Sequence, residues 1–487
     1  MATRYRVGTM QSAAAKTALR YVDDEVVQRL LKVMDFLVFF ATAIFYSTAF
    51  AGRHDIPNGI AIISFFALGL ALLCVMFLRD LGLYKVPALV NGGWAFLKST
   101  ATLFITGYVA FSLLNHFVIP LESHWLLYWT LVVTAHLGSS RFMAQTWARP
   151  VARQGRFRKR IAIVGGGKVA EDALAVLGSS PDLDIEIIGL FDDRYDGRSP
   201  QSIHAHEKKG KIADLATYAR GNRVDLIIVA IPLSAEDRLL HILKWLWELP
   251  VDIRISGLAS SLKFSPRAYS YIGKLALLSL FDRPLEGWGL FLKNVFDRVA
   301  AGLAIVIFAP VLLVIAAAIR LESKGPVIFK QKRYGFNNEL IEVFKFRSMY
   351  TNLSDANATK LVTKDDPRVT RVGRIMRKTS LDELPQLFNV LTGQLSLVGP
   401  RPHATQAKAA DTLYEQVVDG YFARHKVRPG ITGWAQINGW RGETDTREKI
   451  EQRVKYDLDY IDRWSLMFDI AILARTPFAL FKSENAY

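Results

Sequence analysis

Cysteine is almost absent from this sequence, because Cys74 is the only one among 487 residues. A single cysteine rules out an intrachain disulfide and a cluster of thiolates that binds a metal ion. Cys74 lies within an apolar run. We therefore expect it to pack against neighbouring side chains rather than to react.

Recognition motifs for nucleic acid are also missing, although the chain is strongly basic. Its 61 Lys and Arg residues exceed its 45 Asp and Glu residues and give a net charge of +16. Such an excess suits anionic lipid, nucleotide phosphates or nucleic acid, and without a recognition motif we expect no nucleic-acid partner. Many basic residues lie beside apolar segments, as in the run 153–160, which indicates cytoplasmic flanks of membrane segments.

A cleavable signal peptide is not indicated, because polar and charged residues precede the first apolar run and no clear cleavage site follows it. Hydrophobic residues make up 51% of the chain and the mean hydropathy is +0.17, which is typical of a membrane protein. We predict a transmembrane domain over residues 1–150 with about four helices. The apolar stretches that approach the ~20 residues needed to cross a bilayer are 33–51, 60–78, 99–118 and 125–145.

Basic residues are distributed unevenly between the loops that join these stretches. The positive-inside rule then places the N-terminus and everything after residue 150 in the cytoplasm. The fourth stretch carries Arg141, which we expect to reach the membrane interface by snorkelling. Asp35 and His116 lie in or beside the stretches, and we favour interfacial or helix-packing positions for them over an ion path.

Residues 151–285 predict a Rossmann-like α/β domain. The apolar segments 161–164, 185–191 and 224–231 are typical of buried strands. The glycine turn 165–170 after the first strand matches a G-x-G-x-x-A nucleotide fingerprint. Two interpretations stay open for this domain, a dinucleotide site and a structural or assembly role, because a fold alone does not establish a ligand.

The apolar segment 299–319 has the length of a membrane span, but we predict that it enters and leaves the same face of the membrane. Basic residues lie on both sides of it, and both sides thus favour the cytoplasm. Pro310 removes a helix hydrogen bond near its middle, where a re-entrant segment would turn. The later stretch 460–482 alternates apolar and charged positions, which is compatible with an amphipathic helix at the membrane surface or with core packing.

An acidic pair, Asp382 and Glu383, follows Ser380 and precedes Pro385. The string fits a helix capping box, but Pro385 fits poorly beyond the opening of a helix because it removes a backbone donor. An Asp carboxylate can attack phosphorus, and a Glu can hold the Mg²⁺ that neutralises a transferring phosphoryl group. Downstream, a Gly-Pro-Arg-Pro turn presents Arg401, and arginine binds phosphate in a bidentate manner. Together these features indicate phosphoryl transfer.

Four blocks in a fixed order carry a resemblance to a known family: residues 344–349, the acidic pair, 399–402 and 428–436. They resemble the bacterial sugar transferases that initiate exopolysaccharide synthesis, the monotopic polyprenyl-phosphate hexose-1-phosphate transferases. The resemblance covers residues 290–487, and the preceding membrane and central domains are similar to the long form of the family. It implies a mostly α-helical catalytic domain with a proline-broken re-entrant membrane helix at 299–319.

The resemblance further implies a two-step reaction at the cytoplasmic face of the bacterial inner membrane. Asp382 would attack the β-phosphorus of a UDP-sugar, release UMP and pass the sugar phosphate to undecaprenyl phosphate, with Mg²⁺ bound by Glu383 as the cofactor. Residues 441–444 and 485–487 are similar to the branch of the family that transfers glucose. The implied phosphate-binding or substrate-binding residues are Lys345, Arg347, Arg377, Arg401, Arg428 and Gln436.

Other interpretations stay open at this point. UDP-galactose is the second choice of sugar donor, and Asp382 could instead be a second metal ligand in a direct transfer. The central domain could be an NAD-dependent sugar-nucleotide dehydratase or epimerase, although residues 160–280 lack a convincing Tyr-x-x-x-Lys pair. A non-enzymatic membrane scaffold leaves the clustering of phosphate-compatible blocks unexplained. Inner-membrane lipid is an expected partner, and a homodimer is possible.

Overall fold

The computed structural model describes residues 24–482 with internal gaps and divides into two compact units, residues 18–158 and the part that begins at residue 159. The predicted glucose-type segments 441–444 and 485–487 lie outside the described residues. The segments outside the description are 1–23, 51–58, 86–87, 90–92, 118–123, 154, 156–157, 180–184, 195–199, 205, 233, 258–268, 283, 352–365, 404–407, 410–411, 414–420, 441–445 and 483–487.

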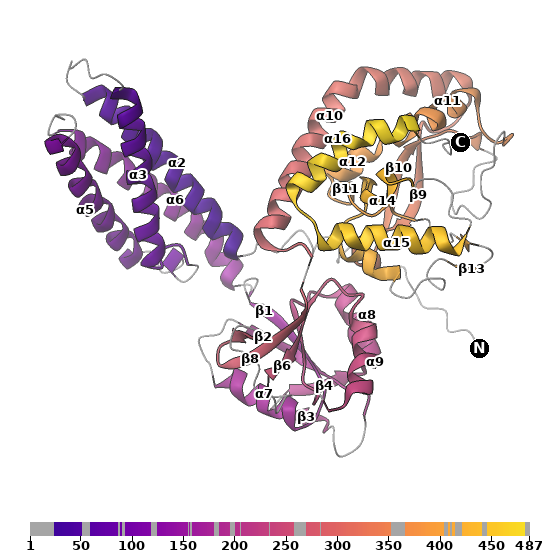
Figure 1. The fold of residues 1–487 in the computed structure, drawn as a ribbon, viewed down its shortest axis with the longest axis horizontal. Coiled ribbons are helices and arrows are strands. Elements are labelled where there is room, and N and C mark those ends of the chain that lie inside the picture. Colours follow the sequence, from indigo (N-terminus) through magenta and orange to yellow (C-terminus); the bar gives the residue numbers. More distant parts are fainter. Residues whose placement is uncertain are drawn as a thin grey trace. The chain divides into compact units, whose positions relative to one another are not determined.

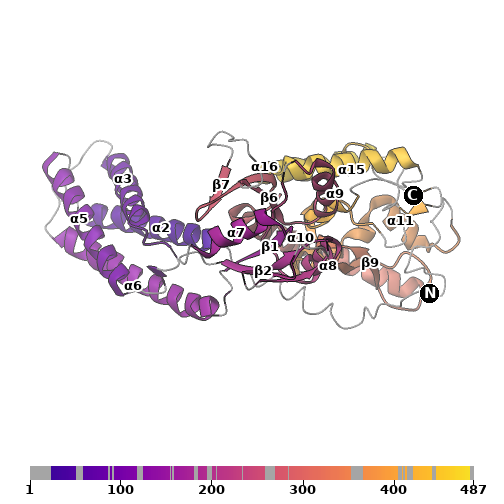
Figure 2. The ribbon, with the colours of Figure 1, turned by 90° about the horizontal axis from the view of Figure 1, so that it is seen from below.

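Four helices form a bundle in the first unit (Figures 1 and 2). They are α2 (Asp24–Phe50), α3 (Gly59–Asp80), α5 (Gly93–Phe117) and α6 (His124–Arg153). Trp125 and Trp129 of α6 are fully buried in the bundle and stack at a ring distance of 5.7 Å. By length and composition α2, α3 and α5 can cross a membrane, whereas α6 is not among the helices that meet this criterion. The predicted four N-terminal helices are observed, and the fourth is the least apolar.

A buried acidic residue, Asp35 on α2, binds three neighbours inside the bundle. Its carboxylate accepts hydrogen bonds from Tyr84 Oη at 2.9 Å and Arg141 Nη2 at 2.7 Å, and it lies 3.0 Å from His136 Nε2. The expectation that Arg141 reaches the interface is wrong, because this residue is only 7% exposed. Its charge is instead neutralised by Asp35, which makes its burial tolerable. Asp35 therefore has the helix-packing role, while His116 is exposed on α5.

An eight-stranded sheet forms the central domain, with the strand order β3-β4-β2-β1-β5-β6-β8-β7. Neighbours from β4 to β6 are parallel, and helices cover both faces, with α7 on one and α8 and α9 on the other (Figure 1). Strands buried on both faces read as apolar runs, which is why the three predicted strands are observed as β1, β2 and β5. The elements are β1 (Lys159–Val164), α7 (Lys168–Gly178), β2 (Ile185–Phe191), β3 (Ser202–Ile203), β4 (His206–Gly210), α8 (Ile212–Gly221), β5 (Leu226–Val229), α9 (Glu236–Leu246), β6 (Asp252–Ser256), β7 (Tyr269–Ile272) and β8 (Leu275–Phe281).

The glycine turn after β1 is closed by an acidic residue from the end of β2. Gly165 has a φ of +116°, and a Cβ there would lie 2.7 Å from Ala230 O, so only glycine fits. Gly166 N donates a hydrogen bond to Asp192 Oδ2 at 2.9 Å, and the same carboxylate pairs with Arg238. Because Asp192 is committed to the loop and to Arg238, this geometry favours the structural interpretation of the turn over the dinucleotide site.

The remaining residues form a mostly helical C-terminal domain. Its core packs α10, α12 and α16 around β11. β9 and β10 pair as an antiparallel hairpin, and β11 and β14 pair in parallel. The elements are α10 (Gly287–Glu322), β9 (Ile328–Tyr334), η3 (Phe336–Asn338), β10 (Leu340–Phe346), α11 (Arg371–Thr379), η5 (Leu381–Glu383), α12 (Gln386–Leu391), β11 (Ser396–Val398), β12 (Lys408–Ala409), β13 (Thr412–Leu413), η6 (Tyr421–Lys426), β14 (Gly430–Thr432), α14 (Trp434–Ile437), α15 (Arg447–Asp462) and α16 (Leu466–Lys482).

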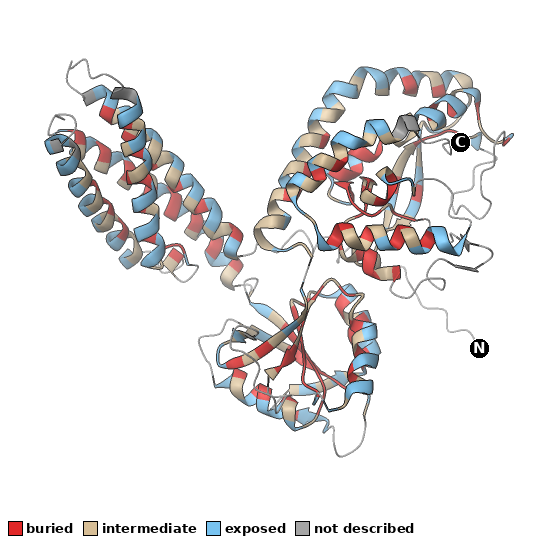
Figure 3. Ribbon diagram, in the orientation of Figure 1, coloured by how far each residue is buried: buried red, intermediate tan, exposed pale blue. Residues whose placement is uncertain are grey.

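α10 is one continuous helix that contains Pro310 and bends across the C-terminal domain (Figure 1). In its first half, Lys293 donates to Val398 O at 3.1 Å and to Asp469 Oδ2 at 2.6 Å. In its second half, Ile319 is 3% exposed and packs in the domain core. Both halves of α10 therefore rest on the same domain, while the middle presents apolar side chains outward (Figure 3). The side chains near the bend that are 69–73% exposed are Val306, Ile307, Leu313 and Val314.

Arg347 closes the C-terminal end of α10. Its guanidinium donates hydrogen bonds to Ser323 O at 2.7 Å, Lys324 O at 3.0 Å and Ile319 O at 3.4 Å. The last carbonyl groups of a helix have no partner within the helix and carry partial negative charge. Arg347 donates hydrogen bonds to these carbonyl groups and offsets their partial negative charge. It thereby fixes the C-terminal end of α10 against the domain.

The stretch 460–482 belongs to two helices rather than to one, because α15 ends and α16 begins within it. The inner face of α16 buries Asp469 and Ile472 at 0% exposure. Its outer face leaves Met467 and Phe478 75% and 71% exposed. Core packing and an apolar outer surface are thus both present on α16, one on each face.

Replacing Asp35 with alanine should destabilise the helical bundle by about 3–5 kcal/mol, because the buried charge of Arg141 then has no partner. The double variant Asp35→Leu/Arg141→Leu removes both charges and should recover most of this loss. Hydrogen exchange of peptides from α2 and α6 in detergent micelles measures the effect. Equal exchange in the single variant and the native protein would show that the pair does not hold the bundle together.

Replacing Arg347 with alanine should loosen the last turn of α10 by about 3 kcal/mol, because several hydrogen bonds to a charged donor are lost. The measurement is hydrogen exchange of a peptide covering residues 315–325. Lys332→Ala is the matched control, since Lys332 is exposed on the adjacent strand β9. The capping role is contradicted if exchange is faster in the control variant than in the native protein, or if exchange in Arg347→Ala is no faster than in the native protein.

Candidate active site

The acidic pair lies on a single 3-10 turn between two helices. α11 ends at Ser380, which adopts a left-handed conformation with φ of +58°, and the turn η5 carries Asp382 and Glu383. Ser380 makes no side-chain capping bond, so the capping-box interpretation is wrong. Pro385 stands at the N-cap of α12, where its missing N–H costs no helix hydrogen bond. The two acids are thereby held on a short, rigid corner.

Glu383 is locked by two cations from different parts of the chain. Its carboxylate accepts hydrogen bonds from Lys345 Nζ at 2.9 Å and from both terminal nitrogens of Arg401, one of them at 3.2 Å. Lys345 comes from β10, and Arg401 comes from the loop after β11. Burial alone would raise the pKa of Glu383, but Arg401 and Lys345 together hold it well below its ordinary value. Glu383 is therefore ionised at neutral pH.

Asp382 differs from its neighbour because its carboxylate has neither a hydrogen bond nor an ion pair within the part of the chain that the structure describes. Burial raises the pKa of this carboxyl above its ordinary value, and the charge of Lys345 opposes that rise. The Asp382 carboxylate is thus poorly solvated and free of direct partners. A carboxylate in this state is well suited to act as a nucleophile.

Arg377 interacts electrostatically with Asp382. Its Nε donates to Ser348 Oγ at 2.9 Å. Burial lowers its pKa, and the charge of Asp382 is the largest influence that raises it. Gln436 is buried, and its Nε2 donates to Ile431 O at 3.4 Å while its Oε1 has no hydrogen-bond partner. The structure therefore gathers Asp382, Glu383, Lys345, Arg377 and Arg401 into one charged group. Gln436 faces this group across a cavity.

Two other predicted phosphate ligands lie elsewhere. Arg347 binds the carbonyl groups at the end of α10, and Arg428 donates to Asn294 Oδ1 on the first half of the same helix. Arg428 precedes β14, whereas Arg401 follows β11. The backbones of the two loops lie close together, but the side chains go to different places, that of Arg401 to Glu383 and that of Arg428 to α10. Arg347 and Arg428 thus contact α10 rather than the acidic pair.

The loop that carries Arg401 is fixed by close backbone packing. A Cβ on Gly399 would lie 2.5 Å from Arg428 O, and one on Gly430 would lie 2.1 Å from Gly399 N, so both positions require glycine. Gly430 N in turn donates to Pro400 O at 3.0 Å. This contact sets the direction in which Arg401 leaves the loop.

Two arginines that sequence reasoning did not single out, Arg333 and Arg424, also bind backbone carbonyl groups of the loop that carries Arg401. Arg333 Nη1 donates to Pro402 O at 2.6 Å, and Arg424 Nη2 donates to Arg401 O at 2.7 Å. Burial lowers the pKa of Arg333 to about 10, with Arg401 also contributing. Arg424 is fully buried and pairs with Asp457 at 2.6 Å. The only sequence signal for Arg333 was its place in a basic strand near residues 344–349, and Arg424 gave none.

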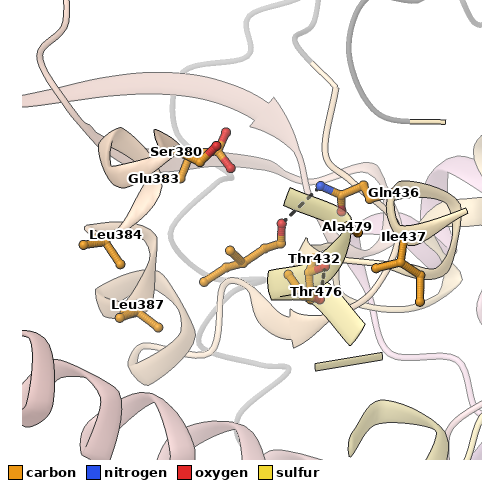
Figure 4. A pocket seen from close by; sticks show the side chains of 10 residues that line it. Ser380, Glu383, Leu384, Leu387, Thr432, Gln436, Ile437, Thr476 and Ala479 are labelled. Atoms are coloured by element: carbon orange, nitrogen blue, oxygen red, sulfur yellow. Dashed lines mark hydrogen bonds between the residues drawn. The ribbon is translucent and has the colours of Figure 1, made fainter. Parts of the chain in front are cut away.

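A cavity of about 180 Å³ lies beside Glu383 (Figure 4). Leu384 and Leu387 face Ile437 across it, and Thr432 and Thr476 lie near Ile437 with their hydroxyls 2.9 Å apart. The walls come from the η5–α12 corner, the β14–α14 segment and helix α16. The other residues that line the cavity are Ser380, Ile431, Gln436 and Ala479.

The acidic pair can hold Mg²⁺ when the phosphates of a substrate supply further ligands. Within the described parts of the chain, no three His, Cys, Asp or Glu side chains are grouped to hold a metal ion. Mg²⁺ is often held by one or two carboxylates together with substrate phosphates. Glu383 Oε2 accepts a hydrogen bond from Arg401 at 3.2 Å and has room for one more partner. Carboxylate oxygens of the pair can thus hold an ion that arrives on a diphosphate.

Comparison with known proteins places these features in a family. The bacterial sugar transferase family matches residues 288–483, and a CoA-binding domain family matches residues 87–257. The UDP-glucose:undecaprenyl-phosphate glucose-1-phosphate transferase of Klebsiella pneumoniae is 39% identical over 361 residues, which cover 74% of this chain and 76% of the relative.

Two further relatives have similar identity. The protein of the same name from Escherichia coli (strain K12) is 37% identical over 387 residues, which are 80% of this chain and 81% of the relative. The undecaprenyl-phosphate glucose phosphotransferase of Komagataeibacter xylinus is 40% identical over 335 residues, or 68% and 61% of the two chains. With such similarity over most of its length, and with an acidic pair set among cationic side chains, this chain belongs to the bacterial sugar transferase family.

Proposed function

We propose that this protein transfers glucose-1-phosphate from UDP-glucose to undecaprenyl phosphate, with UMP and undecaprenyl diphosphate glucose as products. The observation that carries the proposal is an Asp382 without a direct hydrogen bond or ion pair among the described residues, beside a Glu383 that two cations hold ionised. This arrangement suits phosphoryl transfer. The names of the relatives support the choice of donor, acceptor and sugar.

The reaction proceeds in two displacements at phosphorus. An Asp382 oxygen attacks the β-phosphorus of UDP-glucose, the bond to the bridging oxygen breaks, and UMP leaves with the electron pair. An oxygen of undecaprenyl phosphate then attacks the same phosphorus and expels the Asp382 carboxylate. Lys345, Arg377 and Arg401 stabilise the negative charge on the phosphoryl oxygens. Mg²⁺ held by Glu383 would neutralise further charge on the diphosphate.

The catalytic domain works at the cytoplasmic face of the inner membrane, with α10 entering and leaving the same leaflet. Lys293 and Ile319, on opposite sides of Pro310, are both buried against one domain. A helix that crossed the bilayer would have its ends on opposite faces and could not pack both against that domain. The exposed apolar residues between these points, together with the outer face of α16, supply the surface that enters lipid.

The central domain serves a structural or assembly role in this proposal. Asp192 is bound to Gly166 N and to Arg238, so one donor of the glycine turn is already satisfied by the protein itself. The alternative of an NAD-dependent dehydratase or epimerase would require this turn to accept a pyrophosphate. Galactose as the transferred sugar is set aside because the relatives reported above are named for glucose.

Asp382→Asn should lower turnover by about 10³-fold or more, because the nucleophile is lost. Glu383→Gln should lower it by about 10²-fold, since Lys345 and Arg401 lose the charge that orders them. The assay is UMP release from UDP-glucose with Mg²⁺ and undecaprenyl phosphate in detergent, with Glu448→Gln on the exposed side of α15 as the control. Exchange of labelled UMP into UDP-glucose without lipid is expected only for the covalent route.

Two outcomes of that assay contradict the proposal. Full turnover in Asp382→Asn means that Asp382 is not the nucleophile and returns attention to a metal-ligand role or a scaffold. Absence of UMP from the native protein with every UDP-sugar excludes the transferase reaction itself.

The acid limb of kcat/KM should lie at a higher pH than for an ordinary aspartate, because burial raises the pKa of Asp382. Attack requires the carboxylate, so activity is present above this raised pKa and is lost as the pH falls through it. Lys345→Gln removes a charge that lowers the same pKa and should move the acid limb further upward. Lys332→Gln on β9 is the control, and an unshifted limb in Lys345→Gln argues against the coupling.

A further inference from the structure

The cavity beside Glu383 is mainly apolar, although it adjoins the most highly charged part of the domain. Leu384 and Leu387 form one wall, and Ile437 lies across from them (Figure 4). Ile431 also lines the cavity. A phosphate group is not expected to bind in such a space, because burying its charge among apolar side chains costs free energy. The cavity is therefore separate in chemistry from the cluster of cations around Asp382.

On the α16 side of the cavity, the hydroxyl groups of Thr432 and Thr476 hydrogen-bond to each other. Thr476 Oγ1 donates to Ile472 O at 2.8 Å, so the hydrogen bond between Thr432 and Thr476 uses the hydroxyl proton of Thr432. Gln436 Nε2 donates to Ile431 O. The two threonine hydroxyls thus offer no free donor to a ligand, and the remaining polar group there is the Gln436 amide, which keeps one N–H and its Oε1 acceptor.

This distribution of polar and apolar groups discriminates between two candidate occupants, the uracil of UDP-glucose and the isoprenoid chain of the acceptor lipid. Uracil carries two carbonyl oxygens and an N–H that all need partners when they are buried. The hydroxyl protons of Thr432 and Thr476 are committed, so the Gln436 amide alone could not satisfy these groups from that side of the cavity. An isoprenoid chain has only carbon and hydrogen atoms and gains free energy from leaving water. The cavity accordingly suits hydrocarbon better than it suits a nucleobase.

The position of the cavity also favours the isoprenoid chain over the nucleobase. α16 contributes Thr476 and Ala479 to the cavity and exposes Met467 and Phe478 on its outer face. The cavity thus lies between the acidic pair and a helix that carries an apolar outer surface. A lipid phosphate that reaches Asp382 must bring the first carbons of its chain to within a few ångströms of Glu383, which is where the cavity begins.

We propose that this cavity binds the isoprene units next to the phosphate of the acceptor lipid, with Ala479 and Ile437 setting how much chain it admits. The inference rests on the proposed function, since it assigns a site to the second substrate of that reaction. A volume of about 180 Å³ limits it to the first part of the chain. The remainder of the lipid stays in the membrane beyond α16.

The test fills the cavity and leaves the charged cluster untouched. Ala479→Phe should raise the KM for undecaprenyl phosphate by about 10-fold or more, because a pocket discriminates at this level for small changes in fit. The KM for UDP-glucose and the lipid-free exchange of UMP should stay within about twofold of the native values, since neither uses the cavity. Ala474→Phe is the matched control, because Ala474 lies on the exposed side of the same helix.

A second variant keeps the test decisive if Ala479→Phe does not fold. Ile437→Ala enlarges the cavity, and it should weaken discrimination between farnesyl phosphate and a branched or bulkier prenyl phosphate used as short acceptors. A rise in the KM for UDP-glucose alone would assign the cavity to the nucleotide and overturn the inference. Native-like kinetics with all acceptors in both variants would overturn it as well. Loss of the proposed function shows itself differently, as absence of turnover in the native protein.

Discussion

The ion pairs of Glu383 with Lys345 and Arg401 are the contacts on which the catalytic centre depends. They join three segments that are distant in the sequence: strand β10, the turn η5 and the loop after β11. Without Glu383, the two cations would repel one another in a partly desolvated site. The pairs also leave an excess of positive charge, because Arg333 and Arg377 add to the cluster and only Asp382 adds a second negative charge. A diphosphate is the complement of such a charge distribution.

In the proposed arrangement, the depth of this centre at the membrane depends on how α10 is held to the C-terminal domain. Lys293 holds the first half of the helix to β11 and α16, and Arg347 holds the end of its second half. These are polar contacts to main-chain carbonyls or to a buried carboxylate, so sliding the helix along the domain would leave buried groups unpaired. The bend at Pro310 lets both contacts form at once, since a straight helix of 36 residues would be about 54 Å long. Membrane depth and active-site geometry are therefore set by the same helix.

Sequence patterns predicted the elements better than the roles of individual cations. Strands of the central sheet could be recognised because full burial demands apolar runs, and the acidic corner because Pro385 contradicts an ordinary cap. Arg347, Arg428 and Arg401 look alike in a motif, yet only Arg401 reaches Glu383. The difference lies in which backbone carbonyls happen to lie within reach, which depends on tertiary packing of α10 and not on local spacing. Arg141 was misjudged for the same reason, because its partner Asp35 is on another helix.

The opposite pKa directions of the two neighbouring acids explain how one small site can serve two substrates in turn. Glu383 is kept ionised by its partners and organises cations, whereas Asp382 is kept free of partners and available for bonding. In the proposed reaction the sugar phosphate stays bonded to Asp382 between the two steps, so the same cations can bind first the diphosphate of the nucleotide and then the phosphate of the lipid. Only the non-phosphate parts of the substrates need separate places. An apolar cavity on the α16 side meets that need for the lipid, and it leaves the polar side of the cluster to the nucleotide.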